Sequence, residues 1–244
     1  CTFNIWKIWG IIMIFELLIS IIIGSTLIGF GVHFIPVGGA PAALSTTAGV
    51  PTGAPMITIG MGITGILSAL SMTGQSEIVI ILSGAIGSML MMAVTMFFSN
   101  MIHVYGVGVP LASSNFERDP ITGFKQEEYV SPGTTGHGIP TVSFISGVIG
   151  ALFGGIGGSL AFWAIYNYIL GNCHLSSIYT NSISAILAVM LFFIIAVVAS
   201  YNIGGTIQGF YDKKFRKKIV SGTFSCFLIS IFLAIIYMII LGGI

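Results

Sequence analysis

The chain has 244 residues, of which 55% are hydrophobic and only 6% are charged, and its mean hydropathy is +1.05. A soluble domain typically carries about 25% charged residues, because polar groups must cover its surface. The composition therefore indicates an integral membrane protein and excludes a disordered chain. A net charge of +1 argues against nucleic-acid binding, and three cysteines without framework spacing argue against a disulfide scaffold.

Six apolar segments qualify as membrane-spanning helices, for which about 20 residues are needed. In chain order they cover residues 8–32, 56–72, 78–99, 142–170, 183–208 and 219–241. We therefore expect an all-α polytopic membrane protein, with residues 1–244 forming a single integral membrane domain. The three longer connections cover residues 33–55, 100–141 and 209–218.

The distribution of basic residues orients these spans. Five of the eight Lys and Arg residues lie between Lys213 and Lys218. Because basic residues accumulate in cytoplasmic loops, we place this connection in the cytoplasm. Counting spans from there puts the other two longer connections in the cytoplasm and both termini outside. All eight prolines fall between Pro36 and Pro140, so irregular backbone gathers on the same side of the membrane.

A weak internal repeat relates two parts of the chain. The stretch His33–Pro36 precedes the second span and is similar to His137–Pro140, which precedes the fourth. The third span closes with Ser99–Asn100, and the fifth closes with Ser200–Asn202. These matches predict a parallel repeat of two units, each with a loop, one helix outward and one helix back. Chance similarity between membrane segments of simple composition is the alternative.

The fourth span carries Gly150, Gly154 and Gly158, which are spaced four residues apart. Glycines at this spacing remove the side chains from one helix face, so that the backbone of a partner helix can approach closely. We interpret the face as static helix packing. A gate that moves during function is the alternative.

Four residues are candidate Na+ ligands. Glu16 is the only carboxylate well inside a span, where a charge is costly unless it has a partner or a function. Asn100, Ser200 and Asn202 offer neutral oxygens at the ends of the third and fifth spans, where the helix dipole favours a cation. The alternatives are a hydrogen-bonded or outward-reaching Glu16 at a subunit contact, and helix capping by the amide and hydroxyl groups.

The connection after the first span is uncharged and rich in proline and glycine. It is either a re-entrant loop that lines a polar cavity or a connector packed under a partner subunit. Together with the similar stretch before the fourth span, it is our candidate for a substrate or partner-docking loop. The residues concerned are His33, Pro36, Gly38, Gly39, Pro41, His137 and Pro140. The sequence shows no catalytic triad, zinc motif or phosphate loop, so we expect no catalytic residue and no cofactor bound by this chain.

Seven stretches of the chain are distinctive enough to compare with known families. They are His33–Ala43, Gly87–Met92, Asp119–Gly123, Tyr129–Thr134, Gly136–Val142, Ser200–Ile207 and Phe210–Asp212. In these stretches the chain resembles the D subunit of the membrane-bound tetrahydromethanopterin S-methyltransferase of methanogenic archaea. The resemblance runs from about residue 24 to the end of the chain, so it gives no support to Glu16.

The resemblance implies a membrane subunit of a methyltransferase complex that acts in methanogenesis. That complex transfers a methyl group from methyl-tetrahydromethanopterin to coenzyme M and couples the transfer to Na+ export, with Na+ as the coupling ion and a cobamide on a partner subunit. The implied partners are the sister membrane C and E subunits and the cobamide-bearing subunit, in a symmetric hetero-oligomer in contact with membrane lipid. A stand-alone secondary transporter and a purely structural scaffold subunit are the alternatives.

Overall fold

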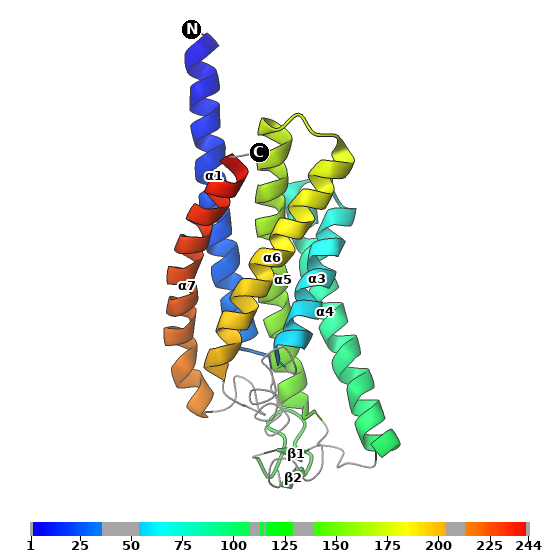
Figure 1. Ribbon diagram of the computed structural model, residues 1–244. Helices are drawn as coiled ribbons and strands as arrows, with labels where there is room; N and C mark the ends of the chain where they lie inside the picture. The colour runs from blue at the N-terminus through cyan, green and yellow to red at the C-terminus, as the bar shows by residue number, and fades with distance from the viewer. Residues whose placement is uncertain are drawn as a thin grey trace.

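The computed structural model describes residues 2–35, 54–107, 113–114, 116–128, 139–203 and 213–242. Most of them belong to six α-helices (Figure 1): α1 (Thr2–Val32), α3 (Ala54–Ser71), α4 (Glu77–Met101), α5 (Thr141–Asn172), α6 (Ser177–Ile203) and α7 (Lys213–Gly242). Two smaller features are a π-helix that continues α4 (Ile102–Val107) and a parallel pair of two-residue strands, β1 (Ser113–Ser114) and β2 (Glu127–Glu128). The predicted α-helical class is therefore confirmed.

Five of the helices are long and apolar enough to cross a membrane, over residues 10–32, 77–106, 141–172, 177–200 and 218–242. The sixth, α3, is shorter in its apolar part, Ile57–Ser71. This agrees with the expectation of about six membrane helices. Helix α6 begins at Ser177, before the expected position at Ile183. Its first turns are polar but contain no helix breaker, so an apolar run alone does not mark its start.

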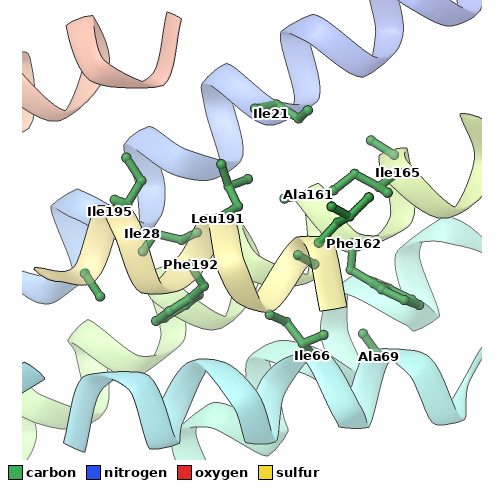
Figure 2. Packing of buried hydrophobic residues seen from close by; sticks show 14 of the residues in the cluster. Ile21, Ile28, Ile66, Ala69, Ala161, Phe162, Ile165, Leu191, Phe192 and Ile195 are labelled. Carbon is green, nitrogen blue, oxygen red and sulfur yellow. The ribbon is translucent and has the colours of Figure 1, made fainter. Parts of the chain in front are cut away.

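Helix α5 lies at the centre of the bundle, in contact with α1, α3, α4 and α6. Within its apolar window 61% of the residues are buried, compared with 28% for α4 and 33% for α1 and α7. Glycine and alanine on α5 make this possible, because small residues allow several helices to approach one axis. Larger side chains fill the remaining space: Phe192 of α6 lies against Gly62 of α3 and Gly158 of α5 (Figure 2).

The helix pairs α3–α4 and α5–α6 run in the same direction along the bundle (Figure 1). Their second helices begin at Glu77 and Ser177 and share one pattern of burial. The buried residues of α4 are Ile80, Gly84, Ala85, Ser88, Met92 and Met96, and the residues 100 positions later in α6 are also buried: Thr180, Ser184, Ala185, Ala188, Phe192 and Ala196. Helix α6 buries Leu187, Leu191, Ile195 and Ala199 in addition. This shared register is what a parallel repeat predicts, although α5 has 32 residues and α3 has 18.

The two ends of the bundle differ. The starts of α3, α5 and α7 lie together with both strands at one end, which we call the loop-bearing end (Figure 1). The turns between α3 and α4 and between α5 and α6 lie at the opposite end, near both termini. Helix α1 extends past that opposite end, because Met13 packs over Gly171 in the last turn of α5 and eleven helical residues precede it.

Candidate functional site at the loop-bearing end

Asn100, at the end of α4, holds the chain immediately before α5. Its Nδ2 donates a hydrogen bond to the carbonyl oxygen of Ile139 at 3.1 Å, and its Oδ1 accepts one from the amide of the same residue. Ile139 precedes Pro140, which is the N-cap of α5. The carboxamide therefore links the end of α4 to the start of α5. One of its two hydrogen bonds uses the oxygen that we expected to be available to Na+.

Ser200 and Asn202 lie near the end of α6, at the same end of the bundle. The Oγ of Ser200 donates a hydrogen bond to the carbonyl oxygen of Ala196 at 2.6 Å, and its side chain is half-buried. Because a hydroxyl has only one proton, its lone pairs remain acceptors that can face a cation. The backbone of Asn202 belongs to α6, but its side chain lies outside the described part of the structure.

Glu16 lies toward the opposite end of the bundle. It follows Met13, which packs over Gly171, by less than one helical turn, and its side chain is exposed on the outer surface of α1. Glu16 therefore does not share a site with the oxygens of Asn100 and Ser200 within this chain. The described residues also contain no group of three or more His, Cys, Asp or Glu side chains that could hold a metal ion.

Two of the seven residues expected in a docking loop have described positions. His33 is buried at the end of α1, where its Nδ1 is hydrogen-bonded to the carbonyl oxygen of Gly29. Pro140 is buried at the start of α5. Neither side chain is therefore presented at the surface of this chain. The other five lie outside the described residues, and they are Pro36, Gly38, Gly39, Pro41 and His137.

Residues 116–128 fold back on themselves at the loop-bearing end, and we call this segment the 116–128 hairpin. Arg118 and Lys125 form an antiparallel bridge. The turn between them is closed by two backbone hydrogen bonds, one of which runs from the amide of Gly123 to the carbonyl oxygen of Asp119 at 2.8 Å. Gly123 has a φ of +74°, a conformation that glycine adopts without a steric penalty.

The tip of the 116–128 hairpin presents two apolar side chains to the surroundings. Ile121 is 44% exposed and Phe124 is 74% exposed. They lie next to the exposed charged residues Arg118 and Lys125. These two side chains offer a small apolar contact to another protein at the end of a polar segment.

Asp119 fixes this hairpin to the start of α5. Its Oδ1 accepts hydrogen bonds from the amides of Ile121 at 2.8 Å and Thr122 at 3.0 Å. Its Oδ2 accepts hydrogen bonds from Nε2 of Gln126 at 2.9 Å and from the amide of Thr141 at 3.1 Å. Thr141 is the first residue of α5, so the carboxylate stabilises both the turn and the beginning of the central helix.

The environment of Asp119 favours its charged form. Burial raises the pKa of this carboxyl, but hydrogen bonds from Thr122, Ile121 and Thr141 outweigh the burial and hold the pKa below its ordinary value. The side chain is therefore a carboxylate at neutral pH. It lies at the N-terminus of α5, where the helix dipole stabilises a negative charge.

Asp119 was not among the residues predicted to have a functional role. The signal that was available is local: an Asp followed by Pro120 and, four positions after the Asp, by Gly123 is typical of a turn that the Asp side chain stabilises. That signal predicts the bonds within the turn. It does not predict the bond to Thr141, because the approach of the turn to α5 depends on the tertiary fold.

The glycines of α5 pack in two different ways. A Cβ atom built on Gly150 would lie 2.5 Å from the carbonyl oxygen of Gly31 in α1, and one built on Gly31 would lie 2.5 Å from the carbonyl oxygen of Gly150. Gly24 and Gly157 make the same reciprocal contact, seven residues away along each helix. At these two points the backbones of α1 and α5 approach as closely as glycine allows.

We expected Gly150, Gly154 and Gly158 to form one face against the backbone of one partner helix. Gly154 and Gly158 instead point toward side chains of two other helices. A Cβ atom on Gly154 would lie 2.6 Å from the terminal Cε of Met61, and one on Gly158 would lie 3.0 Å from the ring of Phe192. These two glycines therefore make room for side chains of α3 and α6. The backbone of Gly154 also lies against α1, since a Cβ atom on Gly31 would lie 2.7 Å from its nitrogen. The partner glycines of α1 were not predicted either, because the pairing of two distant helices cannot be read from either helix alone.

The chain is also similar in sequence to proteins of a known family. The family model for the D subunit of tetrahydromethanopterin S-methyltransferase matches residues 14–230. The D subunit of this name from Methanothermobacter thermautotrophicus is 53% identical to this chain, over 87% of the chain and 90% of the relative. Relatives of the same name from Methanopyrus kandleri and Methanosarcina mazei are 48% and 46% identical, over 82% and 93% of this chain and 85% and 96% of their own lengths.

Proposed function

The chain belongs to the D-subunit family of tetrahydromethanopterin S-methyltransferase, and from this premise we propose that it links methyl transfer to Na+ export. As a member of this family it is one component of a multisubunit complex. In the proposed cycle the methyl group passes from methyl-tetrahydromethanopterin to coenzyme M by way of a cobamide that a partner subunit carries. The chain itself contributes no catalytic residue to this transfer and acts through its helices.

The observation that carries the proposal is the attachment of the 116–128 hairpin to the start of the most buried helix, α5. The cobamide-bearing subunit docks at the loop-bearing end, where Ile121 and Phe124 are exposed. If its methylated and demethylated states bind this end with different affinity, the difference biases the helices between two arrangements. A surface segment fixed to the central helix is the kind of element that such a bias requires.

In this proposal Na+ is bound by neutral oxygens at the loop-bearing end. Ser200 supports the assignment, because its only proton is donated to Ala196 and its lone pairs remain available. Asn202 is the second candidate, two residues beyond Ser200 on the same helix. Asn100 is a weaker candidate because its oxygen already accepts a hydrogen bond from Ile139. Glu16 would need a sister subunit to complete a site on the outer surface of α1.

The loop-bearing end faces the cytoplasm in this proposal, because the basic run from Lys213 to Lys218 begins α7 there. Both termini then lie outside the cell. The exposed apolar faces of the helices, such as Leu82, Ile86 and Leu90 of α4, contact membrane lipid or the sister C and E subunits. The complex is proposed to be a symmetric hetero-oligomer.

The test uses the purified complex reconstituted in lipid vesicles. Uptake of radioactive sodium is measured while methyl-tetrahydromethanopterin and coenzyme M are supplied. We expect uptake that depends on methyl transfer, and none by the isolated chain. Transport by the isolated chain would favour a stand-alone transporter. Normal uptake by a complex assembled without this chain would contradict the proposal and leave the chain a scaffold at most.

A further inference from the structure

The first turn of α5 is not capped by its own N-cap residue. Pro140 occupies that position with φ −64° and ψ 155°, and it makes no side-chain hydrogen bond to the helix. Proline has no polar side chain with which to accept one. The amide of Thr141 donates instead to Oδ2 of Asp119. The central helix therefore begins at a hydrogen bond that a separate folded segment supplies.

The two oxygens of Asp119 have different roles. Oδ1 accepts from amides of its own turn, and Oδ2 accepts from Gln126 and from the amide of Thr141; the Thr141 side chain also hydrogen-bonds the carboxylate. The side chain is 3% exposed, so water does not readily replace these partners. Hydrogen bonds to an ionised group are about twice as strong as neutral ones. A displacement of the turn must therefore carry the start of α5 with it or break this bond.

A displacement of α5 reaches the rest of the bundle through close contacts. Gly150 and Gly157 lie against the backbone of α1, and Gly155 lies against Ala85 and Ser88 of α4. Packed contacts of this kind transmit strain because little free space remains between them. The hairpin, α5 and the two neighbouring helices thus form one connected path from the surface to the membrane-spanning part.

We propose that Asp119 is the positioning residue that transmits docking on the 116–128 hairpin to α5. The inference rests on the proposed function, since it takes docking at the loop-bearing end and Na+ transport by the complex as given. Asp119 touches no reacting group and acts through Thr141, whose amide and side chain both hydrogen-bond it. Its loss should therefore separate the two activities of the complex instead of lowering both together.

Two variants disrupt the hydrogen bond between Thr141 and Asp119, one at the acceptor and one at the donor. Asp119→Asn keeps an acceptor for the turn but places an amide NH2 group against the donors of Gln126 and Thr141. Thr141→Pro removes the amide donor together with the Thr141 side chain, which also hydrogen-bonds Asp119, and proline is well tolerated at the first position of a helix. The matched control is Glu117→Gln, which removes an exposed charge from the same hairpin without touching α5.

The vesicle assay measures the number of Na+ ions taken up per methyl group transferred. We expect this ratio to fall in both variants while methyl transfer continues, and we expect the two effects not to add in the double variant, because both variants break the contact between Asp119 and Thr141. Hydrogen exchange of the first turn of α5 should become at least roughly tenfold faster in each variant, because the hydrogen bond that is lost involves a charged group. Glu117→Gln should match the wild type in both measurements.

Three results would overturn the inference. An unchanged ratio in Asp119→Asn and Thr141→Pro, with a wild-type complex that transports Na+, would refute the inference alone. Failure of both variants to assemble would make Asp119 an assembly residue. Absence of Na+ uptake by the wild-type complex would refute the proposed function and the inference with it.

Discussion

Helix α5 is held by two contacts of opposite kinds. Along its length, Gly150 and Gly157 let the backbone of α1 approach until no side chain fits between the helices. At its start, the side chains of Asp119 and Asn100 hold it: Asp119 accepts a hydrogen bond from the amide of Thr141, and Asn100 is hydrogen-bonded to the backbone of Ile139. A close-packed backbone contact has no alternative partner, whereas hydrogen bonds can be exchanged for those of a docking protein. The comparison indicates that the middle of α5 is held firmly against α1, whereas the hydrogen bonds at the start of α5 can change partners.

The largest expected effect tests the middle of α5. Gly157→Ala places a Cβ atom on the carbonyl oxygen of Gly24, which is backbone and cannot turn aside. We expect a loss of stability near the upper end of the ~1–3 kcal/mol that overpacking usually costs, measured as thermal dissociation of the purified complex. The matched control is Gly154→Ala, where the new atom meets the flexible end of Met61 at 2.6 Å and lies at an ordinary contact distance of 3.6 Å from Phe192. Both variants gain the same helix propensity, so equal effects would contradict the distinction.

The next effect tests the start of α5. Asn100→Ala removes both side-chain hydrogen bonds to the backbone of Ile139. We expect a loss of about 1–3 kcal/mol in stability, because half-buried backbone groups are left without partners. The Na+ concentration at half-maximal methyl transfer should stay the same if Asn100 only holds the chain. A rise in that concentration would instead identify its oxygen as a ligand.

A smaller effect is expected for the proposed Na+ ligands. Asn202→Leu replaces the carboxamide by a side chain of similar volume and removes one oxygen. The Na+ concentration needed for half-maximal methyl transfer should rise about tenfold, which corresponds to ~1.4 kcal/mol of binding. Ser200→Ala is the companion variant and should act in the same direction. A fully assembled Asn202→Leu complex with wild-type Na+ dependence would remove this residue from the ion path.

The smallest expected effect concerns a contact outside the α1–α5 pair. The hydroxyls of Thr26 in α1 and Ser230 in α7 lie 3.3 Å apart. Hydrogen bonds between membrane helices contribute about 0.6 kcal/mol on average, so Ser230→Ala should barely change thermal dissociation. A loss larger than that of Gly157→Ala would show that α7, and not the glycine contact, fixes the position of α1.

The helices were predictable because each needs only a long apolar run, a property that is local in the sequence. The start of α6 was missed because Thr180 and Asn181 belong to polar turns that remain helical. The glycines of α5 were also visible, since their spacing is local. Their partners Gly24 and Gly31 were not, because helix pairing is decided by the whole bundle.

The site was less predictable than the fold, because its contacts join residues that are distant in the sequence. Asn100 was identified as a polar residue at a helix end, which is correct, but its partner Ile139 could not be inferred from the sequence. Asp119 was visible only as part of a turn motif. Its bond to Thr141 joins residues that the fold brings together, and no periodic pattern marks such a pair. Polar contacts between elements leave a weaker pattern in the sequence than apolar helix faces do.

The central claim is that docking acts on the start of α5 while the glycine contact stays fixed. Hydrogen exchange of the purified complex, with the proposed cobamide methylated in one sample and demethylated in the other, tests this directly. The account predicts that exchange differs between the two states over the first turn after Thr141 and is the same around Gly150 and Gly157. Equal exchange at the start of α5 in both states would contradict it, as would a difference confined to the glycine contact.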